Sequence, residues 1–275
     1  MAPQAADLAP GDAWAAGLDW DDIVLHRVRS PQHPRFALGY ELLWRQFGAQ
    51  HEMEQRAVIE SRLGWQPSRP VGGCALLYEM LVLERAGAVV AVRDHSAIVP
   101  LDVPGARVVV HLSHALVVPA ARGTGLGAWL RALPLELARA CAAQAGVPAD
   151  HVTLVAEMEP YEPASTERVA RLRVYGRAGF RCIDPDAVRY QQPDFRTPDA
   201  IDASALAPLP LTLVVRRVGA EHEETVSGAE VRCIVHALYT MYGAHQRARD
   251  MAPLWPRIAA LPADGERVRL LACVS

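Results

Sequence analysis

The stretch that decides the fold reads Val117-Val118-Pro119-Ala120-Ala121-Arg122-Gly123-Thr124-Gly125-Leu126-Gly127-Ala128-Trp129-Leu130. It follows a valine-rich run typical of a buried strand and precedes an Ala/Leu-rich run with helical spacing, which ends near Ala145. The three glycines therefore lie at the predicted start of a helix. The first N–H groups of a helix have no intrahelical partner and attract anions, and glycine lets a phosphate approach the backbone closely. The sequence thus predicts a phosphate-binding turn.

Three kinds of phosphate loop have glycines in such an arrangement, and the sequence separates them. A nucleoside-triphosphate loop needs a lysine, and all 28 of the Lys and Arg residues of this chain are arginine. A dinucleotide fingerprint, G-x-G-x-x-G/A, is matched by Gly123, Gly125 and Ala128. A third pattern, R/Q-x-x-G-x-G/A, is matched by Arg122, Gly125 and Gly127.

A second motif favours the third pattern. The run from Tyr175 to Phe180, Tyr-Gly-Arg-Ala-Gly-Phe, matches Y-x-R/K-x-G-F at the end of a predicted helix that Ser165 or Thr166 begins and Gly179 ends. With both motifs in this order and spacing, the chain resembles the GCN5-related N-acetyltransferases, the GNAT superfamily. The resemblance implies the α/β fold of that superfamily, with a mixed sheet, over residues 21–218.

The elements expected along the chain follow the order of that fold. Strands are predicted at 23–28, 74–84, 88–99, 108–118, 151–158, 181–190 and 211–218, and helices at 34–47, 50–63, 128–145 and 165–178. Residues 1–20, rich in Ala, Pro and Asp, predict a flexible tail. Residues 219–275 predict a C-terminal helical extension with an amphipathic helix near 227–248, packed on its own domain or at a homodimer contact.

Composition narrows the class of partner. The 275 residues carry a net charge of −3, so no basic surface suggests nucleic acid. The five cysteines are widely spaced and include no C-x-x-C pair, so we expect free thiols and no metal site. Free thiols match the cytoplasm as compartment. No apolar run approaches the ~18 residues of a membrane span, and the first residues lack a signal peptide. We expect a soluble, cytoplasmic protein without a membrane partner.

The resemblance implies how the acyl donor, acetyl-CoA, is held. Backbone N–H groups of the turn would bind the pyrophosphate, with Arg122 as a further phosphate contact. These turn residues are Gly123, Thr124, Gly125, Leu126, Gly127 and Ala128. The strand carrying Val117 and Val118 would pair with the pantetheine arm, and the Val117 N–H would face the thioester carbonyl as an oxyanion-hole donor.

The resemblance also implies catalytic roles. Tyr175 is the expected proton donor to the departing thiolate, because a phenol is protonated at neutral pH. Alternation predicts that His111, Ser113 and Val117 share one face of their strand and that His114 points to the other. His111 also falls on a histidine of the arylalkylamine acetyltransferases, which makes it one candidate base.

The rival base comes from the run Glu157-Met158-Glu159-Pro160 at the end of the next strand, where one of Glu157 and Glu159 faces the cleft. A subgroup of bacterial acetyltransferases has a similar E-x-E-x-P run. Many relatives have Asn where this chain has Arg168, so the resemblance does not extend to the usual helix contact with coenzyme A.

The function that these features predict is transfer of an acyl group, acetyl by expectation, from coenzyme A to the primary amine of a small molecule by direct attack. A non-catalytic acyl-CoA sensor or scaffold is the second hypothesis. A Rossmann-type NAD(P) oxidoreductase is the third. The acceptor amine is not readable from the residues.

Overall fold

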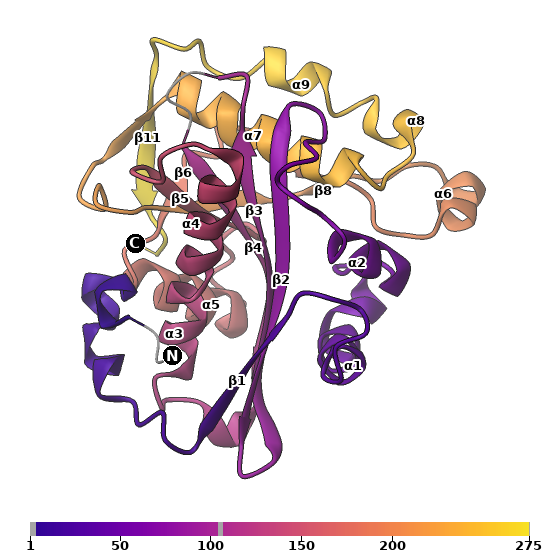
Figure 1. Ribbon diagram of the computed structural model, residues 1–275. Helices are drawn as coiled ribbons and strands as arrows, with labels where there is room; N and C mark the ends of the chain where they lie inside the picture. The colour runs from indigo at the N-terminus through magenta and orange to yellow at the C-terminus, as the bar shows by residue number, and fades with distance from the viewer. Residues whose placement is uncertain (1–3, 104–106, 275) are drawn as a thin grey trace.

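The computed structural model describes residues 4–103 and 107–274 and shows a twisted mixed sheet with helices on both faces (Figure 1). Residues 1–3 of the predicted tail, residues 104–106 and Ser275 lie outside the described part. The strands lie side by side in the order β1 (Ile23–Val28), β2 (Cys74–Arg85), β3 (Ala88–Pro100), β4 (Val108–Val117), β5 (Val152–Met158), β9 (Thr212–Arg217), β6 (Arg181–Ile183), β11 (Arg267–Ala272) and β10 (Thr225–Ser227). The predicted α/β class with a mixed sheet is confirmed.

One face of the sheet is covered by α1 (Phe36–Phe47), α2 (Arg56–Arg62) and α7 (Gly228–Gly243), and the other by α3 (Leu126–Ala132), α4 (Pro134–Ala145) and α5 (Thr166–Arg177). Alternation along β2 explains the two layers. Leu76 packs with α7 and Met80 with α1, whereas Ala75 packs with α4 and Leu81 with α3.

Most predicted elements are present with shifted ends. The expected helix 128–145 begins at Leu126 and is divided at Leu133, because Pro134 lacks the N–H that an unbroken helix needs. The expected strand 181–190 ends at Ile183. The following loop contains the short pair β7 (Gln191–Gln192) and β8 (Leu209–Pro210) and the helix α6 (Pro198–Ser204).

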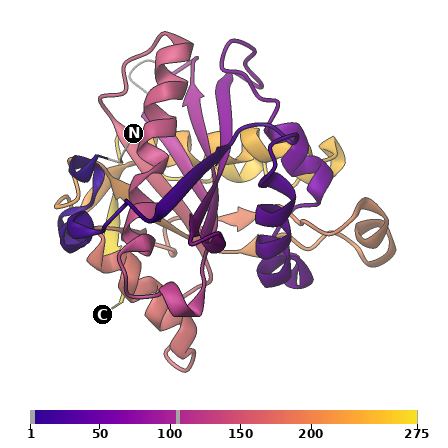
Figure 2. The ribbon, with the colours of Figure 1, turned by 60° about the horizontal axis from the view of Figure 1, so that its bottom comes forward.

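The N-terminal segment differs from the prediction of a flexible tail, which is wrong for residues 4–20. Two 3-10 helices, Ala5–Asp7 and Pro10–Gly17, pack beside α3 and α4, on the opposite side of the sheet from α1 (Figure 2). Asp12 binds Arg131 at 2.7 Å, and the Trp129 indole N–H donates to the Ala15 carbonyl at 2.9 Å. Asp7 and Asp12, two of the three aspartates in this segment, are buried partners of arginines instead.

The C-terminal part contains strands as well as helices. The strand β11 pairs with β6 inside the large sheet, and β10 continues the sheet beyond it. The helix α7 buries Val231, Leu238 and Tyr242 against the sheet, and the short helices α8 (Ala248–Met251) and α9 (Pro256–Ala259) follow it. Residues 219–275 are therefore part of the main sheet and core. None of the described helices is long and apolar enough to cross a membrane.

Candidate active site

The candidate site lies where two parallel strands diverge. The strands β4 and β5 pair with each other from Val108 and Val152 as far as His111 and Val155. Beyond these residues they separate, and β4 stays paired only with β3 and β5 only with β9. A cavity of about 500 Å³ opens at this point. Its walls come from the strands β3, β4 and β5, from the helices α1, α3 and α5, from the loops after α1 and β7, and from Tyr242 of α7.

A bulge in β4 changes the predicted alternation. His111 and His114 lie three residues apart on β4 but oppose Ser96 and Asp94, only two residues apart on β3. Both imidazoles therefore lie on the α1 and α7 face and line the cavity, so the prediction that His114 points away is wrong. Val117 lies on the opposite face from His111, where it packs with the apolar cluster of α3, so their predicted shared face is also wrong.

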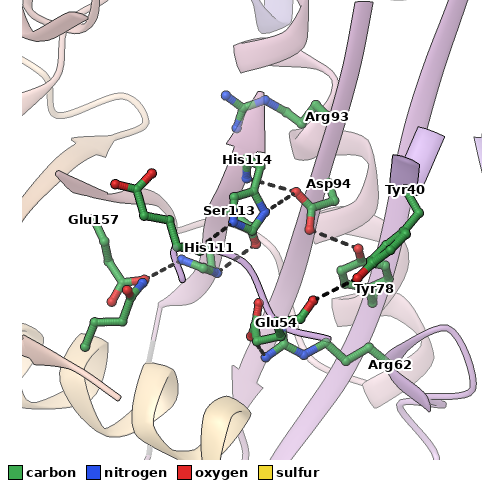
Figure 3. A network of polar contacts seen from close by, with 12 residues as sticks. Tyr40, Glu54, Arg62, Tyr78, Arg93, Asp94, His111, Ser113, His114 and Glu157 are labelled. Atoms are coloured by element: carbon green, nitrogen blue, oxygen red, sulfur yellow. Dashed lines mark hydrogen bonds and ion pairs between the residues drawn. The ribbon is translucent and has the colours of Figure 1, made fainter. Parts of the chain in front are cut away.

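His111 and Glu157 form the centre of a buried polar chain (Figure 3). The Nε2 atom of His111 lies 2.7 Å from Glu157 Oε2, and the same oxygen accepts hydrogen bonds from the Tyr242 hydroxyl and, at 3.1 Å, from Gln192. Burial favours the neutral acid, but the hydrogen bond and charge of His111 outweigh it and keep the pKa of Glu157 below its usual value. An ionised Glu157 requires a proton on His111 Nε2.

The other nitrogen of His111 faces Ser113. Ser113 Oγ lies 3.0 Å from His111 Nδ1 on the wall of the cavity. With the proton on Nε2, Nδ1 carries the lone pair and accepts from the hydroxyl. In this arrangement the Nδ1 lone pair of His111 can accept a proton, and the Glu157 carboxylate lies where it can stabilise an imidazolium.

His114 has a different environment. Its Nδ1 contacts Asp94 Oδ1 and its Nε2 contacts the Glu52 carbonyl, each at 2.9 Å, and the Tyr78 hydroxyl donates to the other oxygen of Asp94. Burial alone would lower the pKa of His114, but Asp94 outweighs burial and raises it to about 9. With both nitrogens donating, His114 is a cation at neutral pH and has no lone pair to accept a proton.

The proposed acid, Tyr175, lies on the other wall. Its hydroxyl accepts a hydrogen bond from Arg93 Nη2 at 3.0 Å, and the Arg131 guanidinium lies over its ring at 5.7 Å. Because the oxygen accepts from arginine, the phenolic proton remains available to another acceptor in the cavity.

The second glutamate of the run, Glu159, also lines the cavity, so the prediction that only one of the two faces the cleft is wrong. It pairs with Arg168 at 2.5 Å and with Arg171 at 3.5 Å, both on α5. Of the two carboxylates, Glu157 is the one that contacts His111. Arg168, which stands in place of the usual Asn, therefore neutralises Glu159.

The glycine turn has the geometry that an anion site requires. Gly123 has a φ of 79° and Gly125 a φ of 98°, in the left-handed region, and Gly125 directly precedes α3. The first bond to a helix carbonyl is donated by Ala128, so the N–H groups of Leu126 and Gly127 have no acceptor within the helix. Thr124 donates to the Ala121 carbonyl and Arg122 to the Val117 carbonyl, which fixes the turn. The strand end with Val117 and Val118 leads directly into this turn.

Three residues of the site were missed by the sequence analysis: Tyr242, Gln192 and Arg93. Tyr242 lies in a helix with ordinary amphipathic spacing, and nothing local distinguishes it from a core residue. Arg93 had a signal, because it begins a polar run, Arg93-Asp94-His95-Ser96, within a strand that is apolar on both sides of the run. Among the described residues, no group of three or more His, Cys, Asp and Glu side chains could hold a metal ion.

Comparison with known proteins gave structural likenesses only. No family model and no curated protein matches the chain. A GNAT-family putative acetyltransferase from Desulfovibrio desulfuricans is 14% identical, with 71% of this chain and 97% of that chain covered and a TM-score of 0.35. A GNAT-family acetyltransferase from Streptococcus pneumoniae is 15% identical, with coverage of 72% and 99% and a TM-score of 0.36.

A third structure, the putative acetyltransferase yncA from Salmonella typhimurium with its cofactor acetyl-CoA, is 24% identical over 51% of this chain and 65% of that one, with a TM-score of 0.29. All three TM-scores are below 0.5, so these likenesses by themselves place no residue of the site. The chain is similar to acetyltransferases of the GNAT family.

Proposed function

We propose that this protein is an acyl-CoA-dependent N-acyltransferase that transfers an acetyl group from acetyl-CoA to the primary amine of a small molecule. The observation that carries the proposal is the cavity between β4 and β5, which has an oriented imidazole on one wall and a phenol with an available proton on the other. The glycine turn after β4 supplies the N–H groups that would hold the pyrophosphate of the donor.

The proposed reaction is direct attack of the amine on the thioester. The amine nitrogen forms a bond with the acyl carbon, and its proton passes to His111, directly or through Ser113 or water. Glu157 stabilises the resulting imidazolium. The carbon–sulfur bond breaks, the sulfur keeps the electron pair, and Tyr175 gives it a proton. Backbone N–H groups at the end of β4, with that of Val117 as the expected donor, would polarise the carbonyl.

The lining of the cavity supports an acceptor with an apolar body. Phe47, Phe195, Met158 and Leu211 form part of its wall. Most of its carboxylates are paired, and burial, with the nearby charge of Glu159, raises the pKa of Glu52 above its usual value. A polyamine would find little uncompensated negative charge here, so we propose a monoamine with an aromatic or aliphatic body.

The test is release of free thiol from acetyl-CoA with a panel of amines, and mass spectrometry of the products. We expect aromatic and aliphatic monoamines to give an N-acetylated product, and polyamines to react more slowly. A protein that binds acetyl-CoA but turns over with no amine would be a sensor instead. A protein stabilised by NAD(P) and not by acetyl-CoA would be neither an acyltransferase nor an acyl-CoA sensor.

A further inference from the structure

Arg93 is a buried guanidinium without a counter-ion in residues 4–103 and 107–274. It lies in β3 on the wall of the cavity and is only 2% exposed. Its Nη2 donates to the Tyr175 hydroxyl, whereas Nε and Nη1 have no hydrogen-bond partner among the described residues. Burial of an unpaired charge is strongly unfavourable, so an arginine without a counter-ion on the wall of a cavity points to an anionic ligand.

The other charged and titratable groups nearby do not supply the missing negative charge. The neighbouring carboxylates are already paired, Glu79 with Arg27 and Arg29 and Asp94 with His114. Arg131, whose guanidinium lies over the Tyr175 ring, is already paired with Asp12. His95 is fully buried next to Arg93 along the strand, and burial, with the positive charge of Arg93, lowers its pKa well below the ordinary value. This wall of the cavity is therefore positive, and arginine remains protonated in proteins.

The anion expected at this wall is set by the reaction. Two atoms acquire negative charge during acyl transfer. The carbonyl oxygen would face the backbone N–H groups at the end of β4, and the sulfur of coenzyme A, when the carbon–sulfur bond breaks, would face Tyr175 in the proposed reaction. On the basis of the proposed function, we propose that the positive charge of Arg93, held at the Tyr175 hydroxyl, stabilises this sulfur as the departing thiolate, before and while Tyr175 protonates it. Arg93 stabilises the charge without giving up a proton, because a guanidinium is too weak an acid.

The inference is tested by calorimetric titration with coenzyme A and with desulfo-coenzyme A, which lacks the sulfur. A free thiol ionises as the pH rises through about 8.5. At pH 9 we expect the wild-type protein to bind coenzyme A about tenfold more tightly than the desulfo analogue, as a charge-assisted contact provides. At pH 6 the two affinities should converge. Arg93→Met should remove the preference at pH 9 and leave the desulfo affinity unchanged, and Arg93→Lys should keep part of it.

Arg216→Met is the matched control, because Arg216 is equally buried but paired with Glu221 and does not line the cavity. It should keep the preference of the wild type. Equal binding of both ligands by the wild type at pH 9 would overturn the role of Arg93 and leave the proposed function standing. If Arg93→Met lost affinity for coenzyme A and for desulfo-coenzyme A equally, Arg93 would have a structural role and the inference would be overturned. If the wild type bound neither ligand, the proposed function itself would be overturned.

Discussion

Arg62 and Arg93 are both fully buried arginines of this chain, and they differ in their partners. Arg62 pairs with Glu54 and lies over the rings of Trp65 and Tyr242 at 5.6 Å, whereas Arg93 has only the Tyr175 hydroxyl. Removing one partner of a buried pair leaves the other charge uncompensated and costs about 3–5 kcal/mol. A buried charge without a counter-ion, such as that of Arg93, contributes no comparable stabilisation to the folded protein.

We therefore predict that the same substitution changes the free energy of unfolding differently at the two positions. Arg62→Met should lower the free energy of unfolding by about 3–5 kcal/mol, because Glu54 stays behind in the core. Arg93→Met should leave this free energy unchanged or raise it. Urea denaturation followed by circular dichroism measures both. A loss in Arg93→Met as large as that in Arg62→Met would mean that Arg93 has a stabilising partner in the folded protein.

His111 is the residue whose loss should affect chemistry most. We predict that His111→Gln lowers kcat by on the order of 10²–10⁴-fold, because general base catalysis is lost while the hydrogen-bonding capacity is kept. The KM for acetyl-CoA should stay close to that of the wild type. Steady-state thiol release measures both constants, with Glu159→Gln as control because Glu159 is paired with α5. Comparable losses of kcat in the two variants would exclude His111 as the base.

The raised pKa of His114 in the folded protein makes stability depend on pH. Asp94 outweighs burial and raises the pKa of His114 to about 9 in the folded protein, above the value of ~6.5 expected when unfolded. A raised pKa contributes stability that is complete below pH 6.5 and is lost as the pH rises through about 9. Thermal unfolding from pH 6 to pH 10 should therefore show a steeper decline in the wild type than in His114→Gln. Parallel profiles would contradict the ion pair.

At the scale of elements, the N-terminal segment depends on two ion pairs to α3 and α4. Asp12 is buried against Arg131, and Asp7 against Arg139. We predict that Asp12→Ala destabilises the protein by about 3–5 kcal/mol, because Arg131 loses its counter-ion. Hydrogen exchange should then accelerate in residues 5–17 before it does in β2. Asp19→Ala, at a residue with no ion pair among those described, is the control, and equal effects would show that the segment is held by other contacts.

The elements that the sequence predicts well are those with a strong local pattern. The hairpin of β2 and β3, the turn at Gly125 and the Ser165 cap of α5 follow from strand composition, glycine chemistry and capping. The N-terminal segment was mispredicted because its order comes from arginines more than a hundred residues away. The bulge in β4 was missed for a similar reason, since only the pairing with β3 reveals it.

At the scale of the whole molecule, the site is assembled from segments that are far apart in the sequence. His111 and Glu157 come from the two diverging strands, and Tyr242 reaches the same carboxylate from α7, in a part of the chain predicted to be an extension. The two motifs predict a donor loop and an acid, Tyr175, from local residues, and both stay predictions. The sequence could offer His111 and Glu157 only as alternative candidates for the general base. Their contact depends on how β4 and β5 are aligned, which no local pattern shows.

The central claim is that the turn and the cavity bind an acyl-CoA, and calorimetric titration tests it most directly. We predict saturable binding of acetyl-CoA to the wild type and no binding of NADH or NADPH. Gly125→Val should lose acetyl-CoA, because residue 125 has a φ of 98° and a Cβ there would meet Ala15 at 3.2 Å, whereas Gly146→Val, in a left-handed turn after α4 with open space, should retain it. Binding of NADH or NADPH without acetyl-CoA, or unchanged acetyl-CoA affinity in Gly125→Val, would contradict the account.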